Sequence, residues 1–159
     1  MKLLVLSDSH GKKFEDISPL FPPDWAECDA VVHCGDIESM SFLDSLYAYF
    51  PTAYVVRGNC DKYDHEDLPG TLLFRVGSVC VAVVHGNSAR HTPHGLIASF
   101  LPERPDLLLF GHTHRRFAEV VEGVLCINPG SVARPRDGRA SLAVVEILGT
   151  DIQYRFEYL

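Results

Sequence analysis

The chain has 159 residues, with 21 acidic and 14 basic side chains and a formal net charge of −7 when histidine is neutral. Its length predicts a single domain over residues 1–159, and its 47% apolar and 22% charged residues exclude a disordered, collagenous or coiled-coil chain. The acidic balance argues against binding of long nucleic acid or of an anionic membrane, because net repulsion opposes both.

Short apolar runs alternate with helical segments in the first third of the chain. Residues 3–6, 30–33 and 53–56 are continuous apolar runs, which predict buried strands. Residues 39–50 carry one broad apolar stripe at helical spacing, which predicts a helix. Another helix is expected within 12–29, although prolines interrupt that segment. This alternation predicts a layered α/β fold.

The remainder of the chain is richer in strand patterns. Residues 72–76 and 79–84 predict a hairpin that turns at Gly77 and Ser78. A short helix is expected over 93–101 and a buried strand over 107–110. The C-terminal part predicts a meander of strands over 117–121, 123–127, 141–148 and 152–158. Because open sheets rarely grow to about ten strands, two sheets are expected.

The cysteines and the N-terminus bear on compartment. Five cysteines lie at irregular spacings without a C-x-x-C pair, so we expect neither a disulfide framework nor a structural zinc knuckle. The first apolar run is too short for the core of a signal peptide, and no stretch approaches the ~18 apolar residues of a membrane span. We therefore expect a cytoplasmic protein with no membrane partner.

Polar side chains follow the predicted strands in glycine-containing loops. The carboxyl ends of strands in an α/β sheet lie along one edge, where ligand crevices form, so these side chains are expected to converge. Taken alone, most of the fragments are typical of a turn or of a buried, hydrogen-bonded histidine. Gly111-His-Thr-His114 is a stronger signal, because two histidines at i and i+2 in a glycine-anchored loop have few structural reasons to recur. Only the ordered set is specific, and its members are Asp8, His10, Asp36, Asn59, His85, His112 and His114.

The chemistry of this set is that of metal ligands. Carboxylate and amide oxygens together with imidazole nitrogens suit Mn, Fe, Co, Ni or Zn rather than calcium. Seven side chains exceed the needs of one ion that must also bind water, whereas two ions that share one aspartate fit the number. The neighbouring glycines are expected to allow turns with positive φ and close approach of ions or phosphate; they are Gly11, Gly35, Gly58, Gly86 and Gly111.

These motifs resemble the signature of the calcineurin-like metallophosphoesterase superfamily. Within it, the compact length, the Gly-Asn-Cys-Asp motif and the late Asn128-Pro-Gly-Ser131 segment are similar to the small YfcE-type phosphodiesterases. The resemblance spans residue 1 to about residue 145. The motifs that carry it are Asp8-Ser-His10, Gly35-Asp36, Gly58-Asn59-Cys60-Asp61, His85-Gly86 and Gly111-His112-Thr113-His114.

The resemblance implies a four-layer sandwich of two mixed β-sheets flanked by helices, the metallo-dependent phosphatase fold. It also implies a phosphodiesterase whose two divalent ions, about 3.5–4 Å apart, activate a bridging hydroxide for attack on phosphorus. Among the possible ions Mn, Ni, Co, Fe and Zn, the resemblance favours manganese. The implied substrates are small phosphodiesters, including nucleotide-like ones. The implied first ion takes Asp8, His10, Asp36 and His114, the second takes Asp36, Asn59, His85 and His112, and the catalytic set is Asp36, Asn59, Cys60 and His112.

Cys60 departs from the family pattern. Much of the superfamily has a histidine after Gly-Asn, placed to protonate the leaving oxygen or to steady transition-state charge. A thiol, with a reference pKa of about 8.5, is a poorer hydrogen-bond donor. We therefore expect activated diesters to be better substrates than alkyl monoesters. The alternative is that Cys60 is a small residue tolerated beside the metals.

Several other residues carry weaker signals. The segment of Asn128, Gly130 and Ser131 is expected either to contact phosphate or to hold the histidine loop. His91 and His94 are candidates for the absent proton donor, although the pattern favours solvated loop histidines. His33 is expected to orient a neighbour. Arginines near the motif loops are candidates for neutralising a substrate anion, namely Arg57, Arg90, Arg115 and Arg134.

Two rival functions remain open from the sequence. One is a phosphomonoesterase or pyrophosphatase that uses the same centre. The other is a protein-interaction scaffold resembling the retromer subunit of this fold, which the intact set of ligating side chains disfavours. An aromatic strip of Tyr154, Phe156 and Tyr158 also allows a homodimer or homotetramer, although core packing explains most such residues.

Overall fold

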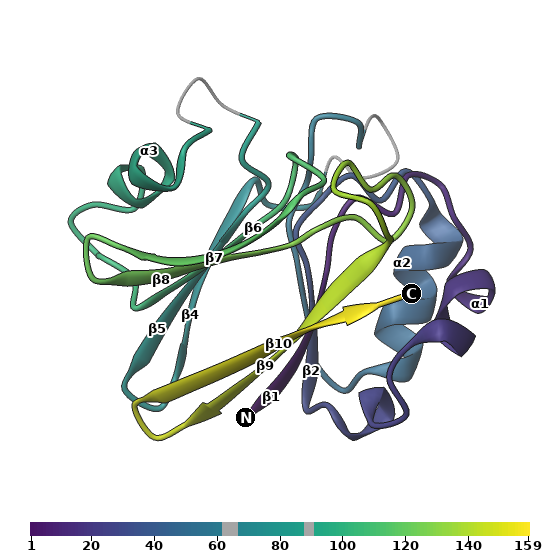
Figure 1. Ribbon diagram of the computed structural model, residues 1–159, viewed down its shortest axis with the longest axis horizontal. Coiled ribbons are helices and arrows are strands. Elements are labelled where there is room, and N and C mark those ends of the chain that lie inside the picture. The colour runs from purple at the N-terminus through teal and green to yellow at the C-terminus, as the bar shows by residue number, and fades with distance from the viewer. Residues whose placement is uncertain (62–66, 88–90) are drawn as a thin grey trace.

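A computed structural model describes residues 1–61, 67–87 and 91–159. The strands described form two five-stranded sheets, with orders β10-β9-β1-β2-β3 and β4-β5-β6-β8-β7 (Figure 1). The first sheet contains β1 (Lys2–Leu6), β2 (Ala30–His33), β3 (Ala53–Val55), β9 (Ser141–Leu148) and β10 (Asp151–Tyr158). The second contains β4 (Thr71–Val76), β5 (Val79–Val84), β6 (Leu107–Phe110), β7 (Arg116–Val121) and β8 (Val124–Pro129).

Each sheet mixes parallel and antiparallel pairs. In the first sheet, β1, β2 and β3 run parallel, whereas β9 pairs antiparallel with β1 and with β10. In the second, β5, β6 and β8 run parallel, and the edge strands β4 and β7 are antiparallel to their neighbours. The central strands are buried on both faces, which explains why they are continuous apolar runs and not alternating patterns.

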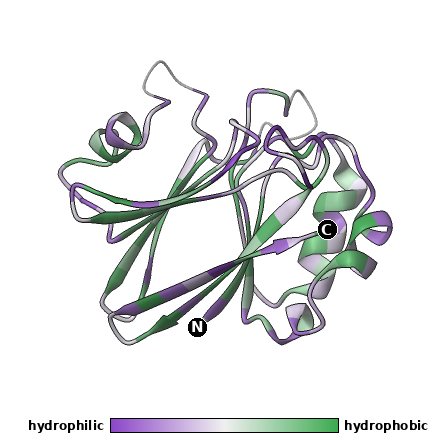
Figure 2. Cartoon of the chain, viewed as in Figure 1, coloured by the Kyte–Doolittle hydropathy of each residue, from purple (hydrophilic) through white to green (hydrophobic). Residues whose placement is uncertain are grey.

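Three apolar clusters separate four layers. One lies between the first sheet and the helices α1 (Phe14–Ile17) and α2 (Met40–Tyr49), and includes Phe14 and Phe42. The second lies between the two sheets and includes Val5 and Leu109. The third lies between the second sheet and α3 (Pro93–Ala98). Figure 2 shows that hydrophobic residues are concentrated in the strands and in the helices that pack against the sheets. The predicted four-layer α/β sandwich is confirmed.

The helices α2 and α3 begin at capping side chains. Ser39 precedes α2 and accepts a hydrogen bond from the amide of Phe42, and Thr92 caps α3 in the same way through the amide of Gly95. The segment expected to hold a broken helix contains only the four-residue α1 and two 3₁₀ turns, η1 (Ser18–Leu20) and η2 (Trp25–Glu27). Proline lacks the amide hydrogen that a longer helix would need there.

The predicted C-terminal meander is wrong in its connectivity. β7 and β8 form a hairpin in the second sheet, whereas β9 and β10 form a hairpin in the first, so the chain crosses between sheets over residues 130–140. Moreover, β8 and not β7 pairs with β6. β8 is almost wholly buried, whereas β7 carries the exposed Glu119 and lies at the edge.

No helix of the described residues is long and apolar enough to cross a membrane.

Candidate metal centre

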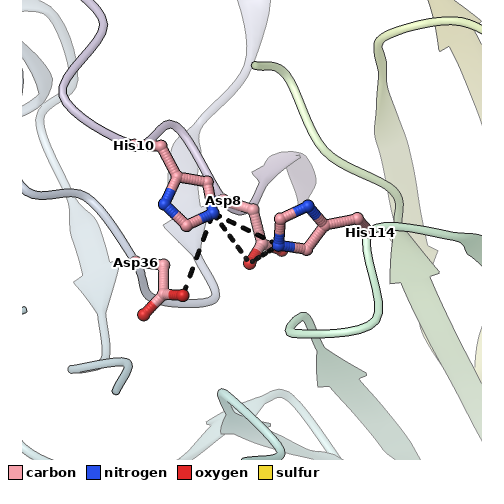
Figure 3. Close-up of side chains that lie close together, drawn as sticks. All are labelled: Asp8, His10, Asp36 and His114. Atoms are coloured by element: carbon pink, nitrogen blue, oxygen red, sulfur yellow. Dashed lines mark hydrogen bonds and ion pairs between the residues drawn. The ribbon is translucent and has the colours of Figure 1, made fainter. Parts of the chain in front are cut away.

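Four of the predicted ligands meet where β1, β2 and β6 end (Figure 3). The ligand atoms of Asp8, His10, Asp36 and His114 all lie within 4.8 Å of one another. The Nε2 atom of His114 is 3.2 Å from that of His10 and 3.2 Å from Asp8 Oδ1. His10 Nε2 lies 3.9 Å from Asp8 Oδ1 and 3.9 Å from Asp36 Oδ2. The Nε2 atoms of His10 and His114 therefore face the carboxylates of Asp8 and Asp36.

The other three predicted ligands gather on the far side of Asp36. The Nε2 atom of His85 lies 3.3 Å from Asp36 Oδ2 and 3.2 Å from the side-chain oxygen of Asn59. The ring of His112 is centred 5.1 Å from that of His85. Asp36 Oδ2 thus lies between two groups of side chains, and the structure brings all seven predicted residues together.

The two buried carboxylates of this arrangement need a compensating positive charge. The side chains of Asp8 and Asp36 are 0% and 2% exposed. Asp8 Oδ2 accepts hydrogen bonds from the Ser7 hydroxyl at 2.6 Å and from the amide of His112 at 3.2 Å, yet Asp8 Oδ1 has no hydrogen-bond partner in the described residues. A buried ion without sufficient partners costs several kcal/mol. Since oxygen and nitrogen donors surround it, the residues present fit a divalent transition-metal ion.

The outer contacts of two histidines prepare them for such an ion. His85 donates from Nδ1 to the carbonyl of Cys34 at 2.7 Å, and His114 donates from Nδ1 to the carbonyl of Arg134 at 2.7 Å. A carbonyl only accepts, so the proton sits on Nδ1 and Nε2 keeps its lone pair. This is the usual support for histidines that bind metal through Nε2.

Backbone strain concentrates at the same residues. Five of the seven candidate ligands have a positive φ: Asp8 (55°), His10 (44°), Asp36 (58°), His112 (67°) and His114 (57°). Non-glycine residues in this region cost about 1–3 kcal/mol each and persist where the surrounding structure holds them for function. The loops are therefore shaped to aim side chains and not to minimise local energy.

The glycines beside the ligands act in two ways. Gly35 has φ 93°, as predicted for this set. Gly58 and Gly111 lack a positive φ, and their role is close packing. A Cβ atom on Gly58 would overlap Asp36 Oδ1, and one on Gly111 would overlap the Ser7 hydroxyl and lie 3.1 Å from Asp8 Oδ2. These two positions make room for the ligand carboxylates themselves.

Residues 1–150 match the family model of the calcineurin-like phosphoesterase superfamily domain. The chain belongs to the calcineurin-like phosphoesterase superfamily. It is 34% identical to the probable metallophosphoesterase YsnB of Bacillus subtilis, over 95% of this chain and 86% of that protein. It is 30% identical to the phosphodiesterase YfcE of Escherichia coli K12, over 87% of this chain and 83% of that one.

Solved structures agree with this assignment. A predicted phosphoesterase from Streptococcus pneumoniae TIGR4 superposes with a TM-score of 0.80 at 28% identity, covering 99% of this chain and 88% of that one. Vps29 of Chaetomium thermophilum also has a TM-score of 0.80, at 18% identity over 99% of this chain and 97% of its own, and shows that the fold is shared. As a metallophosphoesterase, the protein is a hydrolase of phosphoester bonds that works with divalent metal.

The electrostatics of this phosphoesterase site follow from burial and pairing. Burial opposes ionisation of Asp36, but the contact with the His85 ring and the hydrogen bond from the Cys60 amide prevail and lower its pKa. Burial would lower the pKa of His85, yet contact with Asp36 raises it overall. Close contact with the Asp8 carboxylate raises the pKa of His114. Protons on these two histidines compete with metal, so affinity for metal should rise with pH.

Sequence reasoning missed the structural importance of Asp61. This buried carboxylate accepts hydrogen bonds from four backbone amides, those of Asp36 (2.8 Å), Ile37 (2.7 Å), Glu38 (2.8 Å) and Gly58 (2.8 Å). It therefore joins the loop after β2 to the loop after β3. The signal was present, since Asp61 closes the Gly-Asn-Cys-Asp motif.

The Asn128 segment and His33 serve as supports. Asn128 donates to the carbonyl of Gly111 at 2.7 Å and to the Thr113 hydroxyl at 3.1 Å, and Ser131 donates to the carbonyl of Asp8 at 2.8 Å. Of the two roles expected for this segment, the contacts match that of holding the histidine loop. His33 lies 3.1 Å from the Ser9 hydroxyl, and burial lowers its pKa to about 4.

A pocket of about 300 Å³ opens on the site. Arg134 lines it together with Arg136, a residue that the sequence did not single out, and with Cys60 and the candidate ligands His10, Asp36, Asn59, His112 and His114. Three of the other suggested residues, His91, His94 and Arg115, have contacts away from this pocket. Arg115 and His91 line a separate pocket, His94 pairs with Glu122 at 2.6 Å, and Arg90 is outside the described residues.

We expect Gly58→Ala to weaken binding of Mn²⁺ by about 10–100-fold, the usual effect of disturbing a residue that supports a metal ligand. The added methyl group displaces the Asp36 carboxylate. Gly70→Ala is the matched control, because a Cβ atom there meets nothing within 4 Å. Isothermal titration calorimetry on metal-free protein measures both. Equal affinities for the two variants would contradict the role given to Gly58.

Proposed function

We propose that this metallophosphoesterase hydrolyses small phosphodiesters, nucleotide-like ones included, with two divalent ions. The observation that carries the proposal is the position of Asp36 Oδ2, 3.9 Å from His10 Nε2 and 3.3 Å from His85 Nε2. One carboxylate oxygen between two groups of donors suits a shared ligand. The first ion would take Asp8, His10, Asp36 and His114, and the second Asp36, Asn59, His85 and His112.

Divalent ions bound there would supply Lewis acidity, which lowers the pKa of water and stabilises negative charge on the phosphoryl group. The protein supplies placement and charge. Arg134 and Arg136 line the pocket and offer cations to the substrate anion. His112 is the candidate ligand whose pKa burial and the neighbouring His85 lower, so it stays neutral and ready to coordinate. Manganese is the proposed ion, because carboxylate, carbonyl and water oxygens suit it.

The preference for diesters rests on Cys60. Burial and the carboxylates of Asp36 and Glu38 raise the pKa of this thiol to about 12. A thiol so weakly acidic gives little general-acid assistance to a departing alkoxide. Apart from the candidate ligands, the described residues that line the pocket are Cys60, Arg134 and Arg136. Substrates with good leaving groups, such as aryl diesters, should therefore react best.

The rival functions make weaker use of the site. A phosphomonoesterase or pyrophosphatase would share the ions but would benefit from a strong proton donor at position 60. A scaffold would need neither seven converging ligands nor five strained backbone positions. Assembly into a homodimer or homotetramer and location in the cytoplasm stay predictions.

Metal removal and reloading test the proposal. Purified protein stripped of metal and reloaded with Mn²⁺ should hydrolyse a chromogenic phosphodiester faster than the matching monoester. Asp36→Asn and His85→Ala should each lower kcat/KM by roughly 100-fold or more. Each variant weakens a ligand of an ion that contributes several kcal/mol to stabilising charge in the transition state. Val120→Ala, on the exposed face of β7 with the residue 69% accessible, is the control and should keep full activity. Wild-type rates in both site variants would refute the enzymatic centre.

Exchange at position 60 tests the substrate preference separately. We expect Cys60→His to raise monoesterase relative to diesterase activity by at least about tenfold, the lower part of the range for general-acid catalysis. Cys60→Ser controls for the simple loss of sulfur and should leave the ratio low. A ratio that does not change in Cys60→His would remove Cys60 from the explanation of specificity.

A further inference from the structure

The far edge of the His10 ring faces away from the candidate centre. Its Nε2 atom points to Asp8, Asp36 and His114, and its Nδ1 atom lies on the opposite side of the ring (Figure 3). The side chain is 3% exposed, yet Nδ1 has no hydrogen-bond partner among the described residues. The carboxylate oxygen Oε2 of Glu38 lies 3.5 Å from Nδ1.

Two further ligand types approach His10 from separate loops. The ligand atoms of His10, Glu38 and Cys60 all lie within 4.8 Å of one another. Glu38 has φ 57°, a left-handed conformation that a non-glycine residue adopts at a cost. Cys60 lines the pocket and accepts a hydrogen bond from Asn59 Nδ2 at 3.3 Å. Glu38 lies outside the family motifs, and its part in the proposed reaction is limited to raising the pKa of Cys60.

One nitrogen, one carboxylate and one sulfur form a ligand set that differs from that of the candidate centre. The seven predicted ligands are all nitrogen or oxygen donors, whereas a cysteine sulfur favours softer ions, among which Zn²⁺ binds histidine, cysteine and glutamate together. We propose that His10 Nδ1, Glu38 and Cys60 form a zinc site at the rim of the pocket, with water completing the coordination. On binding, the thiol loses its proton to solvent.

Occupancy of this site has a consequence for His10. A neutral imidazole has one unprotonated nitrogen. Zinc on Nδ1 therefore leaves the proton on Nε2 and withdraws His10 from Asp8, Asp36 and His114. Excess zinc would then inhibit the enzyme by competing for a shared histidine. This inhibition rests on the proposed function, whereas the zinc site itself does not.

Cobalt(II) as a spectroscopic substitute for zinc tests the site without relying on activity. Wild-type protein titrated with Co²⁺ should develop the near-ultraviolet charge-transfer absorption of a thiolate–cobalt bond, and Zn²⁺ should abolish it. The band should be absent in Cys60→Ser. In Glu38→Gln, which loses a ligand, the Co²⁺ concentration that gives half of the full band intensity should rise at least about tenfold. Glu27→Gln, whose side chain is 77% exposed, is the matched control and should behave as wild type.

Two results would overturn the site. One is the absence of the band in the wild type. The other is a band unchanged in Glu38→Gln, which would assign Cys60 to the Asp36 centre. Asp8→Asn separates the two proposals, since it weakens the candidate centre but should keep the band. A band that depends on Glu38 in a protein without hydrolytic activity would refute the proposed function and leave the zinc site standing.

Discussion

The structure depends on keeping two carboxylates ionised inside the protein. Asp8 and Asp36 are almost completely buried, and a buried carboxylate that lacks enough partners costs several kcal/mol. Hydrogen bonds from the Ser7 hydroxyl and from backbone amides offset part of this cost. The remaining demand is for positive charge, which a divalent ion between the histidines supplies. The strained loop conformations are then the cost of aiming side chains at that charge.

The fold supplies the place for this arrangement. The parallel strands of both sheets end along one edge, and the site lies where the two sheets meet. Contacts between distant segments hold it there: Ser131, after β8, binds the carbonyl of Asp8, and Asn128 binds that of Gly111. Asp61 joins two further loops through four amides. The crossing of the chain between sheets over residues 130–140 also brings Arg134 and Arg136 to the pocket.

Local patterns predicted the parts of the molecule that local physics controls. Buried strands are visible in the sequence as apolar runs, and the helix α2 as an apolar stripe at helical spacing. The layers and the convergence of the seven side chains therefore followed from the order of the motifs. The partnership of the last four strands did not, because burial of β8 against β6 is decided by tertiary packing. The bonds of Asp61 and the contact between His10 and Glu38 likewise depend on loop geometry that spacing does not encode.

Anomalous diffraction from crystals grown with Mn²⁺ tests the central claim most directly. Two peaks are expected, one among Asp8, His10 and His114 and one among Asn59, His85 and His112, each in contact with the Asp36 carboxylate. A peak elsewhere on the molecule, or none within bonding distance of Asp36 at saturating Mn²⁺, would contradict the account.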